Sequence, residues 1–248
     1  MFKVLFALTI LLEFITVPIF LRYYWPTKCK QSMLFKMISA TLFVLCGVFA
    51  MKISGNNTPY ATLMLWGLVF GWFGDLFLHW LKNVMPIFVL GVVAFLTGHI
   101  FYVIAFQKAI EKTYPGSATF EWYEVLFVAV SVILVTILTV IKGFYKDRAG
   151  MTAGSSVYGV LLLTMLAKTA RYAIGEWAYG TNDNVVAVFI TVLGGGIFFA
   201  VSDILLGYIL MFKDEKRSLR IINIVTYFIA QILLASSILF VRSPYPLA

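Results

Sequence analysis

The chain alternates long apolar runs with short polar connections, and this alternation constrains its fold more than any other feature. Eight runs lie at about residues 2–21, 34–51, 61–80, 86–107, 122–141, 155–174, 185–210 and 221–241. A helix needs roughly 20 apolar residues to cross the hydrocarbon core of a bilayer, and each run approaches that length. No polar segment is long enough to fold alone. The sequence therefore predicts an all-α polytopic membrane protein, a single domain (1–248) of eight transmembrane helices with short loops.

The composition excludes a soluble protein. Hydrophobic residues make up 62% of the chain and charged residues 12%, whereas soluble domains are about half apolar and a quarter charged. The net charge of +8 sits mostly in the short connections, where membrane orientation and anionic lipids explain it better than nucleic acid does. The first run has no small-residue cleavage site, so we expect a transmembrane helix and not a signal peptide.

The basic residues predict an orientation. Twelve of them flank or lie in the first, third, fifth and seventh connections: Arg22, Lys28, Lys30, Lys36, Lys82, Lys142, Lys146, Arg148, Lys213, Lys216, Arg217 and Arg220. Five lie on the opposite side: Lys3, Lys52, Lys108, Lys112 and Arg242. Because cytoplasmic loops carry the excess of Lys and Arg, we expect the odd connections in the cytoplasm and both termini on the other side.

Two carboxylates interrupt apolar runs at similar expected depths. Asp75 lies seven residues before Lys82, and Asp203 lies ten residues before Lys213. At about 1.5 Å per residue, both are about 10–15 Å inside the cytoplasmic boundary. An ionisable side chain costs roughly 2.5–3.5 kcal/mol at the centre of a membrane helix, so such groups face the interior of a bundle. The shared depth favours one polar cavity.

Other polar residues accompany the two aspartates. His99 lies near the midplane, and Tyr102 shares its helix face. Lys36 is expected in the cytoplasmic half, and it or Lys168 is the partner of Asp75 if that carboxylate is only a structural ion pair. In a cavity, Lys168 instead suits a substrate phosphate.

Three further features have mainly structural interpretations. His79 ends its run beside Trp80 and is expected at the membrane interface. Arg171 is expected to extend to the interface, as long basic side chains do. Gly67 and Gly71 form a pair of small residues that favours close helix packing.

The residues leave two classes of hydrolysis open. A pair of carboxylates in different environments supports general acid–base chemistry. A metal hydrolase needs ligands such as Asp75, Asp203, His99 and His79, but two histidines exclude a three-His zinc site. The chain has no G-x-S-x-G, H-E-x-x-H or phosphate-loop motif.

Four segments, in order, resemble the signature segments of the YhhN-like lysoplasmalogenases: "GWFGDLFL" (71–78), "FLTGHIFYVIAF" (95–106), "LGGGIFFAVSDILLGY" (193–208) and "TYFIAQILLA" (226–235). The likeness covers about residues 34 to 240. The chain departs from the family pattern after Lys36, where Met37 replaces an expected proline. The polar positions that match the family are Asp75, His99, Tyr102, Ser202, Asp203, Tyr227 and Gln231.

The resemblance implies an eight-helix membrane hydrolase that cleaves the vinyl ether bond of lysoplasmalogens. The products are a fatty aldehyde and glycerophosphoethanolamine or glycerophosphocholine. Asp75 and Asp203, in unassigned order, are then the acid and the stabilising base, and His99 holds or relays protons. The expected substrate-binding residues are Lys36, Tyr102, Lys168, Ser202, Tyr227 and Gln231. No cofactor is expected, and the partners are the lysophospholipid and membrane lipids.

Two alternatives remain at this point. A transporter or channel for a small solute or proton would use Asp75 and Asp203 as relay sites. A metal-dependent lipid hydrolase would use the ligand set named above. We expect a bacterial inner membrane as the location, with an endoplasmic reticulum membrane as the alternative.

Overall fold

The computed structural model describes residues 1–25, 27–55, 58–80, 84–141, 149–179, 183–212 and 216–241. All the regular elements in these ranges are helices, which confirms the predicted all-α fold. Some of the cations used to predict the orientation lie outside the described residues: Lys82, Lys142, Lys146, Arg148, Lys213 and Arg242.

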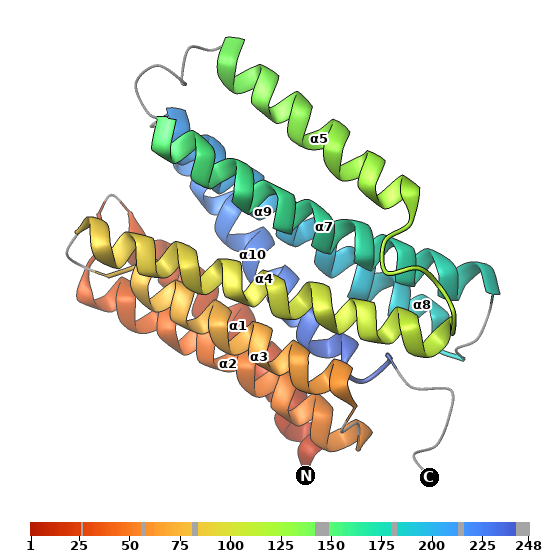
Figure 1. Cartoon of the computed structure of the whole chain (residues 1–248). Coiled ribbons are helices and arrows are strands. Elements are labelled where there is room, and N and C mark those ends of the chain that lie inside the picture. The colour runs from red at the N-terminus through yellow and green to blue at the C-terminus, as the bar shows by residue number, and fades with distance from the viewer. Residues whose placement is uncertain are drawn as a thin grey trace.

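The helices follow the eight predicted runs in order (Figure 1). They are α1 (Phe2–Tyr24), α2 (Lys30–Ser54), α3 (Pro59–Leu78), α4 (Met85–Thr113), α5 (Trp122–Ile141), α7 (Ala149–Tyr179), α8 (Val185–Val188), the π-helical segment η1 (Phe189–Gly194), α9 (Gly195–Phe212) and α10 (Arg217–Ser237). The segments α8, η1 and α9 follow one another directly and correspond to the seventh predicted run. Most observed helices extend a few residues beyond the predicted ends.

The helix lengths fit a bundle that crosses a membrane. Among the described residues, seven helices are long and apolar enough to span a bilayer. They correspond to every predicted run except the fifth, where the apolar part described is the shorter stretch Trp122–Ile137 of α5. The fold is therefore that of a polytopic helical membrane protein.

Local sequence signals explain where the helices begin and end. Thr58 caps α3 by accepting a hydrogen bond from the backbone N–H of Ala61, and Pro59 follows in the first turn, where a missing N–H costs nothing. Cys29 and Ser32 form a reciprocal capping box at the start of α2. Gly55 ends α2 with a φ of 61°, a left-handed conformation that glycine adopts without strain.

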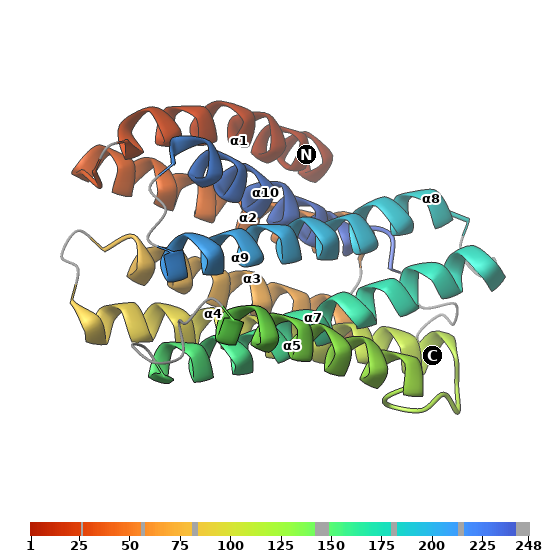
Figure 2. The same ribbon diagram turned by 90° about the horizontal axis from the view of Figure 1, so that it is seen from above.

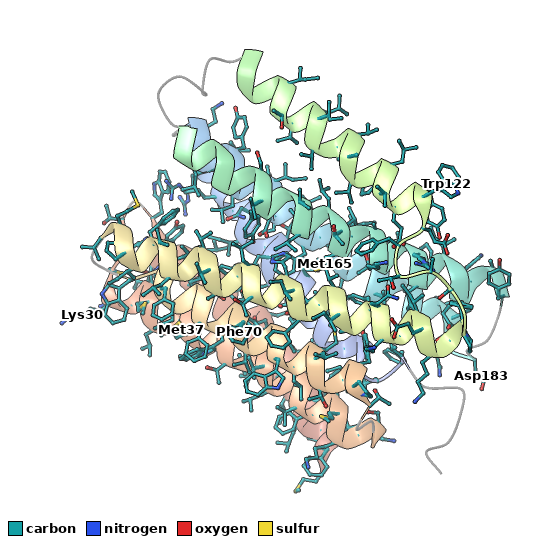
Figure 3. The ribbon with its side chains drawn as sticks, viewed as in Figure 1. Lys30, Met37, Phe70, Trp122, Met165 and Asp183 are labelled. Carbon is teal, nitrogen blue, oxygen red and sulfur yellow. The ribbon has the colours of Figure 1, made fainter. Side chains whose placement is uncertain are left out.

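Helix α10 lies in the middle of the bundle and positions the site. It packs against α2, α3, η1 and α9, while α1 pairs with α2 and α3 pairs with α4 (Figure 2). Helix α5 stands at the outside of the bundle and packs on α7 (Figures 1 and 2). Side chains fill the space between α4 and α7, where Met165 is fully buried (Figure 3).

Glycines allow the helices around α10 to approach closely. A Cβ atom on Gly67 would lie 2.2 Å from the ring of Tyr102 on α4, and one on Gly71 would lie 2.8 Å from Gln231 Nε2 on α10. The predicted pair of small residues on α3 thus allows both α4 and α10 to pack closely against α3. A Cβ on Gly196 would similarly meet Thr169 Oγ1 of α7, which brings α9 close to that helix.

Candidate functional site

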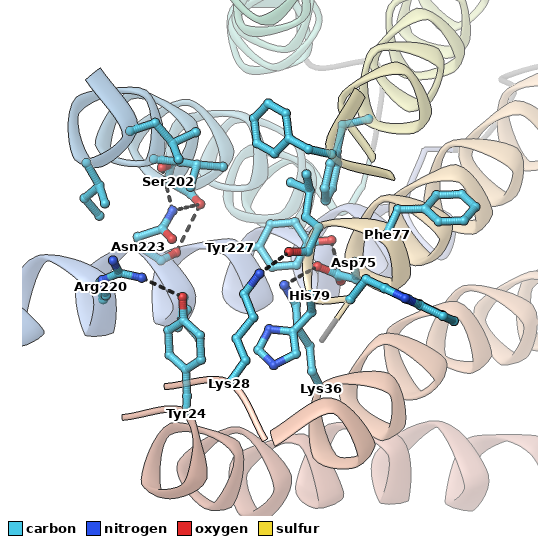
Figure 4. A pocket seen from close by; sticks show the side chains of 18 of the residues that line it. Tyr24, Lys28, Lys36, Asp75, Phe77, His79, Ser202, Arg220, Asn223 and Tyr227 are labelled. Carbon is cyan, nitrogen blue, oxygen red and sulfur yellow. Dashed lines mark hydrogen bonds and ion pairs between the residues drawn. The ribbon is translucent and has the colours of Figure 1, made fainter. Parts of the chain in front are cut away.

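A cavity of about 580 Å³ lies at the end of the bundle where α1 leads to α2 and α3 leads to α4. Asp75 and Asp203 both line it, so the two carboxylates predicted to share a cavity do so. The polar lining residues come from α1, α2, α3, α7, α9, α10 and the connections that follow α1 and α3, and most of them are shown in Figure 4. Apolar side chains of α4 and α9 complete the wall.

Asp75 is held by a cation and a phenol. Its side chain is 1% exposed, Lys36 Nζ lies 2.9 Å from Oδ1, and the Tyr227 hydroxyl donates to Oδ2 at 2.8 Å (Figure 4). Of the two lysines considered as its partner, the structure selects Lys36. An ammonium and a phenol donor both favour the ionised carboxylate over the acid.

A hydrogen-bond chain extends from Asp75 into the core. Gln231 Nε2 donates to the Tyr227 hydroxyl at 3.0 Å, and the Tyr102 hydroxyl donates to Gln231 Oε1 at 2.9 Å. Tyr227 lines the cavity, while Tyr102 and Gln231 lie behind it and are not among its lining residues. The structure therefore does not place Tyr102 and Gln231 where substrate would touch them, and their contacts make them supports for Tyr227.

Asp203 has a different set of partners. Tyr158 of α7 donates a short hydrogen bond of 2.5 Å to Oδ2, and His99 Nε2 lies 3.5 Å from the same oxygen. The other ring nitrogen of His99, Nδ1, donates to the Phe95 carbonyl at 2.8 Å, since a carbonyl oxygen only accepts. The predicted association of His99 with the aspartates is thus a contact with Asp203.

Ser202 ties α9 to α10. Its hydroxyl donates to the Asn223 carbonyl at 3.0 Å, and Asn223 Nδ2 donates back to the Ser202 carbonyl at 2.7 Å and to its hydroxyl at 3.0 Å (Figure 4). Ser202 lines the cavity as a residue that fixes the position of its neighbour Asp203.

Lys168 does not belong to this cavity. Its Nζ lies 3.0 Å from Glu124 Oε1 and also donates to the Thr119 carbonyl, near the opposite end of the bundle. Arg171 joins the same cluster through Glu121 and Glu124, so it does not simply extend to the interface. Glu121 directly precedes α5 and Glu124 lies in its first turn, and a single sequence gives no direct sign that α5 packs on α7 there.

His79 is buried, contrary to the interfacial position expected from its place at the end of a run. It is 2% exposed, caps α3, and shares a hydrogen bond of 2.9 Å with the Ser32 hydroxyl. Burial, reinforced by the positive charges of Lys36 and Lys28, lowers the pKa of His79 to about 2. The ring is therefore neutral, and it joins the end of α3 to the start of α2.

Sequence reasoning missed several residues that line the cavity: Tyr24, Lys28, Tyr158, Arg220 and Asn223. Arg220, Asn223, Tyr227 and Gln231 recur at steps of three and four, the spacing of one helix face, so this signal was present in α10. Tyr158 had no comparable signal.

The described residues hold no group of three or more His, Cys, Asp or Glu side chains arranged to bind a metal ion. In the described part of the chain, the ligand set considered for a metal hydrolase is divided: His79 bonds to Ser32, Asp75 to Lys36, and His99 contacts Asp203. These residues do not fit a resident metal.

The fold and the cavity define a polytopic helical membrane protein with two carboxylates in a largely buried polar site. The YhhN family matches residues 31–238, most of the chain, and the protein belongs to that family. Comparison with curated proteins and with solved structures gave no match.

Proposed function

We propose that the protein is a membrane hydrolase that cleaves the vinyl ether bond of lysoplasmalogens. The observation that carries this proposal is the placement of Asp75 and Asp203 in one cavity with different partners. The chain belongs to the YhhN family. Its signature segments resemble those of the YhhN-like lysoplasmalogenases, which supports the proposal. The products would be a fatty aldehyde and glycerophosphoethanolamine or glycerophosphocholine.

The cavity suits a lipid with one hydrocarbon chain. Its apolar wall includes Phe88 and Met85 from the start of α4 and Leu206 and Ile209 from the end of α9. Its volume of about 580 Å³ lies within the range of small-molecule sites, roughly 300–1,000 Å³. The polar residues face this wall from α2, α3 and α10.

The contact between His99 and Asp203 requires a proton. Nδ1 of His99 carries a hydrogen, so Nε2 of the neutral ring presents a lone pair to Asp203 Oδ2. An ionised carboxylate also presents only lone pairs, and two acceptors facing each other in a buried site repel. The pair is therefore stable with one additional proton, either on the carboxyl group or on the imidazole. This is the proton available to a substrate.

Cleavage of a vinyl ether needs an acid and an anion. The proton of the Asp203–His99 pair is added to the β carbon of the ether, and the double bond electrons form the new C–H bond. The resulting oxocarbenium ion is stabilised by the carboxylate of Asp75, as in the related transition state of glycoside hydrolysis. Water then adds to the cation and loses its proton to a carboxylate. The hemiacetal finally collapses to aldehyde and alcohol, with no covalent enzyme intermediate.

The test is aldehyde release by the purified protein in detergent with a lysoplasmalogen substrate. Asp75→Asn and Asp203→Asn should each lower kcat by at least about 100-fold, the lower range for a general acid or base. Asp183→Asn is the matched control, because Asp183 is exposed at the far end of the bundle from the cavity (Figure 3). Full activity in either cavity variant would remove that aspartate from the mechanism.

The transport hypothesis gives the opposite outcome in the same preparation. Solute or proton flux in liposomes, abolished by either aspartate substitution, with no aldehyde from any vinyl ether lipid, would replace the hydrolase by a transporter. The cavity residues would then serve as relay sites.

A further inference from the structure

Among the described residues, three cationic side chains line the cavity: Lys28, Lys36 and Arg220. The described part of the lining holds two carboxylates, Asp75 and Asp203. Lys36 pairs with Asp75, and Asp203 is engaged with Tyr158 and His99. The described lining of the cavity therefore carries more positive than negative charge.

Arg220 lies at the start of α10 with an incomplete set of partners. Its Nη1 donates to the Tyr24 hydroxyl at 2.9 Å, and its Nε is buried without a hydrogen-bond partner (Figure 4). No carboxylate of the described residues lies within ion-pair distance of the guanidinium. A planar guanidinium with an unused donor is suited to a tetrahedral oxyanion, which it can bind through two parallel N–H donors.

Lys28 places a second positive charge near that of Arg220. Its Nζ donates to the Leu78 carbonyl at 2.8 Å, at the end of α3. Burial, and then the charges of Lys36 and Arg220, lower the pKa of Lys28. The cations are thus close enough to repel one another, and an anion bound between Lys28 and Arg220 would offset that repulsion.

We propose that Lys28 and Arg220, with the Tyr24 hydroxyl, form a site for the phosphodiester of a lysophospholipid head group. This site rests on the proposed hydrolase function and identifies its substrates as phospholipids, in preference to neutral ether lipids of the same chain. It takes the role that the sequence suggested for Lys168, which lies elsewhere.

The position of the site fits one lipid molecule. Arg220 and Tyr227 lie on one face of α10, seven residues apart, which is about 10 Å along the helix. A phosphate at Arg220 therefore leaves room for the glycerol backbone before the ether oxygen reaches the Tyr227–Asp75 pair. Asn223 lies between them on the same face.

The decisive comparison uses two substrates that differ only in the phosphate head group: a lysoplasmenyl phospholipid and the neutral 1-alkenylglycerol. In Arg220→Gln and Lys28→Gln, KM for the phospholipid should rise about tenfold or more with kcat nearly unchanged, while KM for the alkenylglycerol stays as in the wild type. Arg220→Lys keeps the positive charge but loses the paired N–H donors of the guanidinium, so it should raise KM for the phospholipid by a smaller factor.

Arg217→Gln is the matched control, because Arg217 lies one turn away on α10, exposed and outside the cavity. Equal KM changes on both substrates, or none on the phospholipid, would overturn the proposal.

A binding experiment separates failure of this site from failure of the hydrolase function. The probe is a saturated 1-alkyl lysophospholipid, which has no vinyl ether to cleave, and the measurement is its equilibrium binding to purified protein in detergent. Binding that weakens about tenfold in Arg220→Gln, and not in Arg217→Gln, supports the phosphate site even if no aldehyde is ever released. Equal binding to the wild type, Arg220→Gln and Arg217→Gln would contradict the phosphate site.

A test with inorganic phosphate distinguishes a site for the phosphate of a lipid from a site for free phosphate. Thermal stabilisation by the alkyl lysophospholipid, with none by millimolar phosphate, supports a lipid ligand. Stabilisation by phosphate alone, to the same extent and equally lost in Arg220→Gln, would overturn the lipid assignment in favour of a free phosphate site.

Discussion

At the scale of single residues, the hydroxyl of Tyr158 connects α7 to the proposed acid. It donates to Asp203 Oδ2, the oxygen that also faces His99. Tyr158 thereby helps to fix the orientation of the Asp203 carboxyl group. Since Tyr158 is the polar residue that the described part of α7 supplies to the cavity, this contact is how α7 takes part in the site.

Replacing Tyr158 by Phe should lower kcat about tenfold and leave KM for the lysophospholipid nearly constant. A hydrogen bond to a charged or proton-sharing group contributes about 1.5–3 kcal/mol, and about 1.4 kcal/mol corresponds to a factor of ten in rate. The measurement is aldehyde release against substrate concentration. Tyr179→Phe is the control, because Tyr179 is 75% exposed at the end of α7 away from the cavity. A Tyr158→Phe variant with wild-type kcat would show that the hydroxyl does not support Asp203.

The sequence predicted some pairings of the polar residues and missed others. Lys36 was one of two lysines considered as a partner for Asp75, and the two residues form an ion pair. Lys168 was also considered, but its depth along α7 did not reveal that Glu124 of α5 lies beside it. Contacts between helices far apart in sequence depend on how the helices pack, and the apolar pattern of a single sequence does not predict that packing.

At the scale of helices, the contact between α3 and α4 shapes the inner side of the site. Gly98 allows α4 to approach the Gly67 carbonyl, where a Cβ on Gly98 would lie 3.1 Å from that oxygen. Gly67 in turn leaves space for the Tyr102 ring, which holds Gln231. Close packing of two helices thus determines the position of the hydrogen-bond chain that ends on Asp75.

Gly67→Ala should therefore reduce both stability and activity. Its Cβ would lie 2.2 Å from the Tyr102 ring, so the buried tyrosine must move and its bond to Gln231 lengthens or breaks. We expect a loss of about 1–3 kcal/mol, as for other overpacked sites, seen as a lower melting temperature in detergent. Gly207→Ala is the control on α9, because a Cβ there meets nothing within 4 Å. A Gly67→Ala protein as stable and active as the control would contradict this account of the packing.

The helices themselves were largely predictable, and their irregularities were not. Apolar length and the polar connections located helices at all eight predicted runs, since a membrane helix must satisfy its backbone internally. Among the described residues, seven of these helices are long and apolar enough to span a bilayer. The π-helical segment Phe189–Gly194 within the seventh span was not expected, because an extra residue in a turn leaves the apolar pattern unchanged. The packing of α5 on the outside of the bundle was equally hidden, as its sequence is apolar on all sides.

At the scale of the whole molecule, the described cations separate by end. The end that holds the cavity carries Arg22, Lys28, Lys30, Lys36, Lys216, Arg217 and Arg220. The other end carries Lys3, Lys52, Lys108 and Lys112, together with Lys168 and Arg171, whose charges are paired with Glu121 and Glu124. Because Lys and Arg are retained on the cytoplasmic side, we propose that the cavity opens toward the cytoplasm. Lipid in the cytoplasmic leaflet would then reach the phosphate site first.

Cys29 gives a direct test of this orientation. It lies between α1 and α2 at the cavity end and is partly exposed, whereas Cys46 is buried and should not react. A membrane-impermeant maleimide should therefore label the protein in inside-out vesicles and leave it unlabelled in intact cells. Cys29→Ser, which keeps a side chain able to cap α2, is the control and should abolish labelling. Labelling of Cys29 in intact cells would place the cavity on the outer side, and the substrate would then have to come from the outer leaflet.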